Sequence, residues 1–185
     1  MSTATAAATA TRLPTGTWVV DPVHSQVGFT VDYHVGTFRG TFAPLSARLA
    51  VAEDGAATLS GSVPVSGVHV QDENLVAHLK SPEFFDADRT PEISFRSRDV
   101  QVSADQIEVT GELTIRGIAL PVTATGTVSE PKTYADRPYL GLTLSATVDR
   151  TRFGMNWNNA LPSGEPALAN DVRLNAELFL TQAGD

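Results

Sequence analysis

The sequence predicts an all-β fold with a single short helix, and three observations support this. Nine stretches alternate apolar and polar residues with a period of two, which is typical of antiparallel strands buried on one face. Gly, Pro and Asp residues, which favour turns, separate many of these stretches. Only residues 72–80 carry a helical pattern, with Asp72 as the expected N-cap and Pro82 ending the helix.

The expected strands follow one another in order, each bounded by turn or loop residues. The first begins at Trp18 and ends at the corner Asp21-Pro22. Pro44 interrupts the third stretch and indicates an edge or a bulge. Residues 131–138 and 151–170 lack a clear period and are expected to form loops. The strand-like stretches cover residues 18–20, 27–31, 42–51, 59–65, 93–95, 107–115, 120–128, 140–148 and 172–180.

Periodicity alone does not decide between a β-sandwich and a β-barrel, but two features favour a barrel. Several strands of about ten residues would span roughly 33 Å each, which gives a tube about 25 Å tall when the strands are tilted. Small residues also occur on the inward rows and leave room inside. They are Gly61, Gly111, Ala124, Gly126, Ala146 and Ala176. An eight-stranded barrel can hold one small ligand, although the glycines could instead mark bulges and bends.

Length, charge and cysteine content narrow the possible functions. The chain has 185 residues, a formal net charge of −8 and no cysteine, which excludes disulfides, thiol nucleophiles and cysteine-ligated metal centres. The acidic balance argues against binding to nucleic acid or docking on an anionic membrane. Residues 1–14 are expected to be a disordered tail without signal-peptide features, and residues 15–182 a single domain. No window suits a membrane helix, so a cytoplasmic protein is the expectation.

Several motifs, in order along residues 17–181, resemble the YceI-like (polyisoprenoid-binding) family. The first two are Trp18-x-x-Asp21-Pro22-x-His24-Ser25-x-Val27-x-Phe29-x-Val31 and His34-x-x-x-Phe38-x-Gly40-x-Phe42. The next are His78-Leu79-x-Ser81-x-x-Phe84-Phe85-Asp86 and Pro91-x-Ile93-x-Phe95. The last are Gly111-x-Leu113-Thr114-Ile115-Arg116-Gly117, Pro121-Val122-Thr123 and Arg150-x-x-Phe153-Gly154-Met155-x-Trp157-Asn158. The chain departs from the family pattern at Thr90, Ala119 and Arg152, all in expected loops, which bears on ligand preference more than on fold.

The resemblance implies an extended, lipocalin-like antiparallel barrel that holds a long apolar chain, such as a polyprenyl lipid or an isoprenoid quinone. Such a ligand needs apolar lining, because each buried methylene is worth about 0.8 kcal/mol. The inward rows supply candidates for this lining: Phe29, Val31, Leu113, Ile115, Leu142, Leu144, Leu174 and Leu178. The aromatic loop residues Phe84, Phe85, Phe153 and Trp157 could ring an entrance or plug one end. His34 and Phe38, from the second motif, complete the candidate set.

Arg150 is the one cation in this candidate set. It could meet a polar head group, or it could pair with Asp149 or Asp86 in a structural role. No cofactor is expected besides the lipid, and no stable membrane insertion. An open mouth or an edge strand could support a homodimer.

Two other functional classes stay open at this point. One is an enzyme that acts on the lipid with His34 or His69 as acid or base. The other is a stress or regulatory barrel that is filled by its own side chains. The four histidines lack HxxxH or HExxH spacing, so no metal site is expected. His24-Ser25 is no triad, because neighbouring strand residues point to opposite faces.

Overall fold

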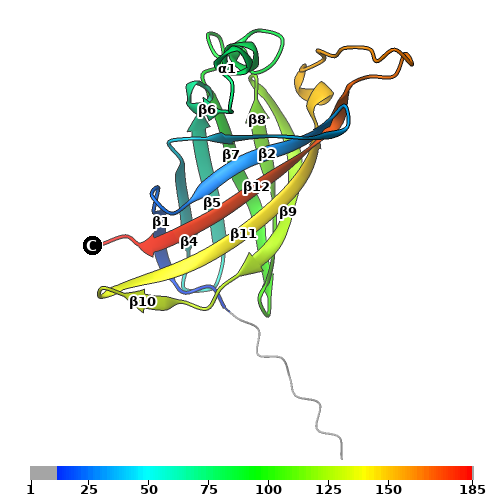
Figure 1. The fold of residues 1–185 in the computed structure, drawn as a ribbon. Helices are drawn as coiled ribbons and strands as arrows, with labels where there is room; N and C mark the ends of the chain where they lie inside the picture. Colours follow the sequence, from blue (N-terminus) through cyan, green and yellow to red (C-terminus); the bar gives the residue numbers. More distant parts are fainter. Residues whose placement is uncertain (1–11, 185) are drawn as a thin grey trace, which may run out of the picture.

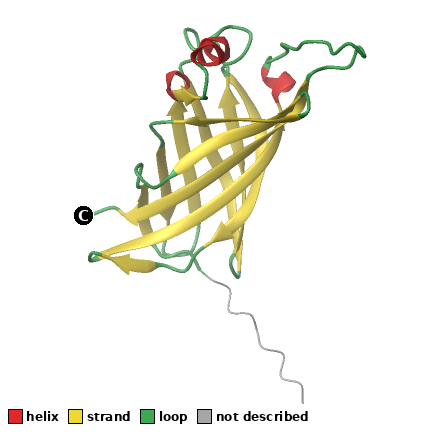
Figure 2. Cartoon of the chain, in the orientation of Figure 1, coloured by secondary structure: helices red, strands yellow, loops and turns green. Residues whose placement is uncertain are grey.

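Within residues 12–184, which the computed structural model describes, twelve strands join into one antiparallel sheet (Figures 1 and 2). The expected tail therefore lies largely outside the described residues, although Leu13 packs against the barrel. The first six strands are β1 (Gly16–Val20), β2 (Gln26–Tyr33), β3 (Gly36–Phe42), β4 (Ser46–Val51), β5 (Ala57–Pro64) and β6 (Val68–His69). The others are β7 (Glu92–Ser103), β8 (Gln106–Ile115), β9 (Ile118–Val128), β10 (Lys132–Tyr134), β11 (Arg137–Asp149) and β12 (Leu168–Gln182).

Eight of these strands close into a barrel, which confirms the predicted fold class. The ring runs β11-β9-β8-β7-β5-β4-β1-β12, and the long pairing of β11 with β12 closes it. That last pairing continues over eleven residue pairs, from Tyr139–Thr181 to Asp149–Asp171. Closure leaves the ring without a free strand edge, which removes a site for unwanted strand pairing.

Two chain corners let the remaining strands extend the wall toward the helical end. β12 pairs with β1 near its C-terminus and with β2 along its N-terminal half, so β1 and β2 follow each other along one edge. β3 and β4 likewise follow each other along the next edge, because β3 pairs with β2 and β4 pairs with β1. Pro44 lies in the connection between β3 and β4, where no ladder hydrogen bond needs its missing N–H.

The alternating apolar and polar residues of the sequence point to the inside and to the outside of this wall, respectively. On β8, Ile107, Val109 and Leu113 are buried, while the intervening Gln106 and Glu108 are exposed. The same parity holds on β11, where Leu140, Leu142 and Leu144 are buried. The period-two rows therefore predicted the inward face of the long strands correctly.

One α-helix, α1 (Glu73–Lys80), lies across one end of the barrel (Figure 1). The Asp72 carboxylate accepts hydrogen bonds from the backbone N–H of Asn74 (2.9 Å) and of Leu75 (3.2 Å), as an N-cap does. The helix stops at Lys80, before Pro82, in agreement with the sequence. Two short 3-10 helices, η1 (Val65–Gly67) and η2 (Arg150–Phe153), complete the helical segments of the described chain.

Two segments expected as loops contain regular structure. Residues 131–138 include β10, which forms a hairpin with the start of β11. The segment after Asp149 begins with η2, whose first turn is capped by the Asp149 carboxylate accepting from Thr151 N (2.9 Å) and Thr151 Oγ1 (2.6 Å). Both elements are too short to produce a recognisable period in the sequence.

The barrel interior holds two hydrophobic clusters, one toward each end. The cluster at the α1 end includes Phe29, Phe85 and Phe153. The other lies toward β1 and the start of β11, where Trp18, Leu49, Leu140, Leu142 and Leu180 are all at most 1% exposed. Large side chains of the second cluster, such as Trp18 and Leu180, fill this end of the barrel.

Candidate ligand-binding cavity

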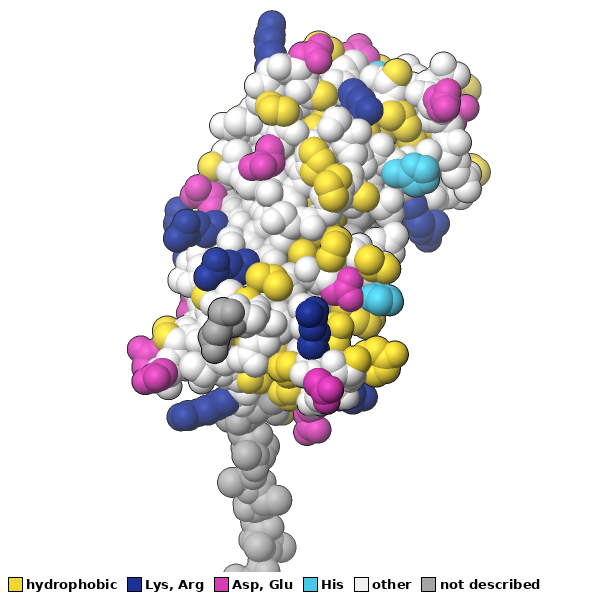
Figure 3. All heavy atoms as spheres, turned by 90° about the vertical axis from the view of Figure 1, so that its left-hand side faces the viewer, with side chains coloured by type: hydrophobic (Ala, Val, Ile, Leu, Met, Phe, Trp, Pro, Cys, Tyr) yellow, Lys and Arg dark blue, Asp and Glu magenta, His cyan; other side chains and the backbone are white. Residues whose placement is uncertain are grey.

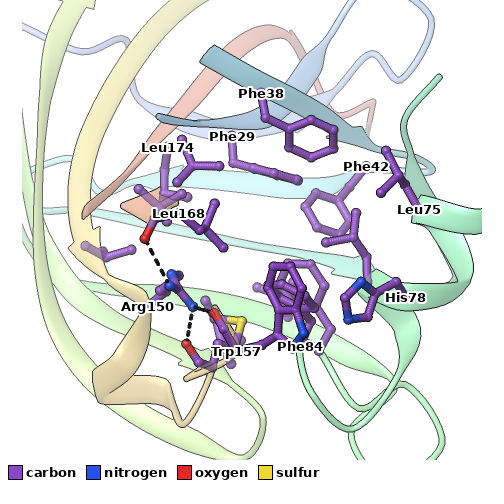
Figure 4. Close-up of a pocket in the computed structure, with 18 of the residues that line it drawn as sticks. Phe29, Phe38, Phe42, Leu75, His78, Phe84, Arg150, Trp157, Leu168 and Leu174 are labelled. Carbon is purple, nitrogen blue, oxygen red and sulfur yellow. Dashed lines mark hydrogen bonds between the residues drawn. The ribbon is translucent and has the colours of Figure 1, made fainter. Parts of the chain in front are cut away.

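A cavity of about 210 Å³ lies in the barrel under α1, and nearly all of its lining is apolar (Figure 4). β2, β8 and β12 supply its walls, and α1 and the loops after α1 and η2 supply its outer rim. Ten of the candidate residues line it: Phe29, Val31, Phe38, Phe84, Phe85, Leu113, Ile115, Arg150, Trp157 and Leu174. The structure therefore gathers most of the sequence-predicted set around one space, although contact with a ligand stays a prediction.

A second cavity of about 200 Å³ adjoins the first in the middle of the barrel. The two share four lining residues, Val63, Ile93, Leu113 and Leu174. Leu144 and Leu178, also candidates, line this second space. Together the cavities follow the barrel from α1 inward, as a long narrow ligand would require.

Four of the six small inward residues line the second cavity: Gly61, Ala124, Ala146 and Ala176. Gly111 and Gly126 have a different role, because each allows two strands to approach closely. A Cβ at Gly126 would collide with the Thr143 carbonyl oxygen, and one at Gly111 with the Arg96 carbonyl oxygen beside the β7 bulge. Gly111 agrees with the alternative that some glycines mark bulges, whereas Gly126 marks a close approach of two strands in a regular ladder.

Aromatic rings converge at the α1 end of the cavity. The His78 ring lies 4.8 Å from that of Trp157 and 4.9 Å from that of Phe84, in both cases edge to face. Deeper inside, Phe85 lies 5.5 Å from Phe42, and Phe42 5.9 Å from Phe29. Figure 4 shows the Phe84, Trp157 and His78 side chains facing one another at the rim. The loop aromatics thus form the cavity's outer wall.

Arg150 is buried, with 3% of its surface exposed, and its partners are oxygens of the chain itself. Its Nε donates to Ala169 O (2.8 Å), and its Nη1 to Met155 O (2.6 Å) and Trp157 O (2.8 Å). Nη2 makes two longer contacts of 3.4 Å, to Leu168 O and Asn170 Oδ1. These contacts use all five guanidinium N–H groups.

The Arg150 side chain therefore fixes the loop after η2 to the start of β12. Its N–H groups are already used within the chain and are not available to a lipid head group. Burial lowers the pKa of the guanidinium, while nearby Asp149 raises it. These contacts give Arg150 a structural role, but neither Asp149 nor Asp86 is its hydrogen-bond partner. Asn158 supports the same junction through reciprocal bonds with Leu168, with Nδ2 donating to Leu168 O (2.7 Å) and Leu168 N donating to Oδ1 (2.9 Å).

Three candidates lie away from both cavities. Phe153 is 1% exposed and packs within the core cluster at the α1 end. Leu142 belongs to the closed cluster at the other end. His34 sits at the β2–β3 turn with a positive φ of 53°, and its ring rests on that of Tyr33, 4.2 Å away. Sequence parity could not separate cavity lining from packed core, because both present the same apolar inward row.

Other residues complete the lining without having been identified as ligand candidates. They are Tyr33, Phe42, Val63, Leu75, His78, Leu79, Ile93, Val148, Met155, Leu168 and Val172. Arg116 was also missed: it donates to the Pro82 and Phe84 carbonyl oxygens and so fixes the loop that carries Phe84. Inward parity could have identified Val63 and Val172, but only the tertiary contacts identify His78 and Arg116.

The four histidines occupy separate places. His24 Nδ1 lies 2.8 Å from Asp21 Oδ2, and this contact lowers the pKa of Asp21. His69 is exposed on β6, and His78 Nε2 lies 2.6 Å from Glu83 Oε2. In residues 12–184 no three histidine or carboxylate side chains gather as metal ligands. Nor does any helix of that range combine the length and apolar character needed to cross a bilayer.

Charged groups of both signs are interspersed on the outer face shown in Figure 3, with hydrophobic side chains between them. The Arg98–Glu112 and Arg173–Asp32 pairs are solvent-exposed ion pairs on the wall. Exposed pairs of this kind contribute little to stability. The polar face of each strand thus lies toward solvent, while the apolar face encloses the cavities.

The closed antiparallel ring and its internal apolar cavities place the protein among the lipocalin-like β-barrels. Residues 18–180 match the family model described as a YceI-like domain, so the chain belongs to the YceI-like family. It is 28% identical to the UPF0312 protein of Staphylococcus aureus strain USA300 over 163 residues, covering 84% of this chain and 92% of that protein. A UPF0312 protein of Staphylococcus epidermidis is 26% identical with the same coverage.

Solved structures share the fold at low sequence identity. Burkholderia cenocepacia BcnA aligns with a TM-score of 0.74 and 22% identity, covering 86% of this chain and 98% of that one. The Campylobacter jejuni YCEI protein aligns with a TM-score of 0.71 and 18% identity, covering 82% and 88%. A polyisoprenoid binding domain from Saccharophagus degradans aligns with a TM-score of 0.65 and 12% identity, covering 90% and 98%. At these identities the likeness establishes the fold.

Proposed function

We propose that this protein binds a long apolar lipid of the isoprenoid type, a polyprenyl chain or an isoprenoid quinone, inside its barrel and carries or stores it without chemical change. The observation that carries the proposal is the pair of adjoining cavities, whose surfaces are almost entirely apolar and which follow the barrel from α1 inward. A compact ligand would need only one of them. A flexible chain fills both.

Burial of apolar surface is sufficient to hold such a ligand. At about 0.8 kcal/mol for each buried methylene, a few isoprene units offset the entropy lost when the ligand is immobilised. The aromatic rings of Phe29, Phe42 and Phe85 add large flat surfaces along the path. Family membership supports the same conclusion, as does the shared fold of a domain described as polyisoprenoid binding.

The alternative of a lipid-modifying enzyme with His34 or His69 as acid or base finds no support in the geometry. His34 faces the outside of the β2–β3 turn, and His69 is exposed on β6. Neither ring lines a cavity, so neither could reach a lipid held there. The alternative of a barrel filled by its own side chains is disfavoured by the open space beside Ala146 and Ala176.

Tryptophan fluorescence offers a direct test. The chain has two tryptophans, of which Trp157 lines the cavity and Trp18 is buried in the closed cluster. We expect a prenol such as geranylgeraniol, added to delipidated protein, to shift or quench the emission in a saturable manner. The same titration of a Trp157→Phe variant should show little change, because Trp18 is remote from the ligand.

Mass spectrometry of the protein purified without detergent supplies the second measurement. We expect solvent extraction to release an apolar lipid that co-purified with the wild type. A protein that carries no lipid and gives no saturable response to prenols, quinones or long-chain hydrocarbons would contradict the proposed function. Chemical conversion of the bound lipid would contradict the part of the proposal that excludes catalysis.

A further inference from the structure

We propose that His78 and Glu83 form a head-group subsite at the α1 end of the cavity, which accepts an uncharged hydrogen-bonding group of the lipid and disfavours an anionic one such as a phosphate. The inference rests on the proposed lipid-binding function and narrows its ligand class. It separates prenols, whose neutral hydroxyl can donate a hydrogen bond to Nδ1 of His78, from prenyl phosphates.

The pair reaches from the cavity lining to solvent. His78 comes from α1 and lines the cavity, while Glu83 lies in the loop that follows the helix. Their side chains are 30% and 58% exposed, and His78 Nε2 lies 2.6 Å from Glu83 Oε2. Edge-to-face contacts with Phe84 and Trp157 hold the imidazole in place, as Figure 4 shows. The hydrogen bond between Nε2 and the Glu83 carboxylate fixes which ring nitrogen stays available.

His78 is the polar group at this rim with hydrogen-bonding capacity to spare. Its Nδ1 has no hydrogen-bond partner within residues 12–184, since the contact to Glu83 uses Nε2. Arg150, the cation of the lining, has all five N–H groups directed at oxygens of the chain. Tyr33 is the other polar residue of the lining, and it is the rival that an experiment must test.

The charge at the rim favours a neutral ligand. With Glu83 ionised, the pair carries a net charge of −1 beside a neutral imidazole and 0 beside a protonated one, so it offers a phosphate no net positive charge. Lys80, Arg116 and Arg152 belong to the same end but do not line the cavity, and Arg116 is occupied by carbonyl oxygens. A phosphate drawn into this rim would lose hydration beside a carboxylate without gaining a cation.

The opposite end of the barrel cannot take the head group. Trp18, Leu49 and Leu180 are at most 1% exposed there and fill the interior. The middle cavity includes Ser60, Ser62, Ser94, Ser145 and Asn175 in its lining, but the surface it presents is almost wholly apolar and comes from side chains such as Ala146 and Ala176. A lipid therefore enters with its tail inward and leaves its polar end beside His78.

The test compares three probes with the same prenyl chain by isothermal titration calorimetry: geranylgeraniol, geranylgeranyl monophosphate and the hydrocarbon without the oxygen. For the wild type we expect the monophosphate to bind about tenfold more weakly than the alcohol, because its charge is desolvated without a partner. His78→Phe keeps the aromatic contacts and should cost the alcohol about fivefold, with the hydrocarbon unchanged.

Charge variants isolate the role of Glu83. Glu83→Gln should improve monophosphate binding by roughly two- to fivefold, as expected for a partly exposed charge. Glu177→Gln, which changes the net charge equally on the exposed outer face of β12, should leave all three affinities unchanged. Thermal melting confirms that each variant folds.

The outcomes separate the two proposals. Failure of all three probes to bind would overturn the proposed function itself. Binding of the monophosphate as tightly as the alcohol would overturn the head-group inference and leave the carrier function standing. An alcohol preference that survives in His78→Phe but disappears in Tyr33→Phe would move the subsite to Tyr33 and also overturn the inference.

Discussion

Arg150 illustrates how one buried residue can hold the segments that shape a cavity. Its guanidinium links the Met155 and Trp157 carbonyl oxygens of the loop after η2 to the Ala169 carbonyl oxygen of β12. The Trp157 side chain that lines the cavity is thus positioned from behind by Arg150. A buried cation in this position depends on several oxygens at once, because no single carboxylate compensates its charge.

Replacement of Arg150 should therefore lower the free energy of unfolding, mainly because hydrogen bonds are lost and less because the charge is lost. We expect Arg150→Met to lower the free energy of unfolding by about 3 kcal/mol or more, since buried carbonyl oxygens lose their donors. Arg150→Lys should recover only part of this loss, because an ammonium lacks the planar fork of donors. Chemical denaturation measures both. Equal stability of the lysine variant and the wild type would show that charge alone matters.

Ala146 is the residue at which cavity space can be tested most simply. Ala146→Leu places a larger side chain in the second cavity, so we expect uptake of a long prenol to fall about tenfold while the barrel stays folded. Ala119→Leu is the matched control, because Ala119 is exposed on β9. Gly126 cannot serve this purpose: its Cβ would meet the Thr143 carbonyl oxygen, and a substitution there tests folding. Unchanged uptake in Ala146→Leu would place the ligand elsewhere.

The helix α1 is a short element at the rim of the cavity. It is eight residues long, and the Asp72 side chain caps its N-terminus. We expect Asp72→Ala to cost about 1 kcal/mol and to speed amide hydrogen exchange in α1 more than in the strands. The control Asp88→Ala removes an exposed carboxylate from the neighbouring loop. Uniform exchange changes across the barrel would show that α1 does not open separately.

The 3-10 helix η2 depends on a carboxylate in the same way, and this gives it a pH dependence. Hydrogen bonds from Thr151 lower the pKa of Asp149 below its ordinary value of 3.8. A lowered folded-state pKa contributes stability at higher pH, and this contribution is lost as the pH falls below 3.8 toward the folded-state value. We expect Asp149→Asn to be less stable than the wild type at pH 7, and the difference to shrink under acid. A difference independent of pH would contradict this role.

At the scale of the whole molecule, the closed ring separates a rigid floor from an open, lined end. The strands β11 and β12 pair over most of their length, and the cluster around Trp18 fills the floor. The α1 end carries the cavity, the 3-10 helix and the loops. Packed core and cavity thus lie toward opposite ends of one barrel.

A ligand that fills the cavities should stabilise the whole barrel, because it binds the folded state alone. At a free concentration one hundred times the dissociation constant, mass action adds about 2.7 kcal/mol. For a domain of this size we expect the melting temperature to rise by roughly 5–10 °C. Differential scanning fluorimetry with geranylgeraniol measures it, and Ala146→Leu should show a smaller rise. An equal rise in both proteins would indicate binding outside the second cavity.

Much of the fold and part of the site could be predicted from residue patterns. The inward rows on β8, β9, β11 and β12, the position of α1 and its Asp72 cap follow from period and local chemistry. Ten of the fifteen candidate residues line the first cavity and two more line the second. Phe153, Leu142 and His34 do not, because an inward or aromatic residue can equally fill a core or support a turn.

From residue patterns alone, the chain is predicted to have an apolar inside, a polar outside and small residues along the inward rows. Alternation is a local property of each strand, so it can be recognised without knowing which strands pair. The positions of the cavities and of the packed core become visible in the folded barrel. The tertiary structure also shows that Arg150 serves the backbone and that His78 meets Glu83 at the rim. Those assignments depend on which strands close the ring and which loops meet above it, and these are contacts between segments far apart in the chain.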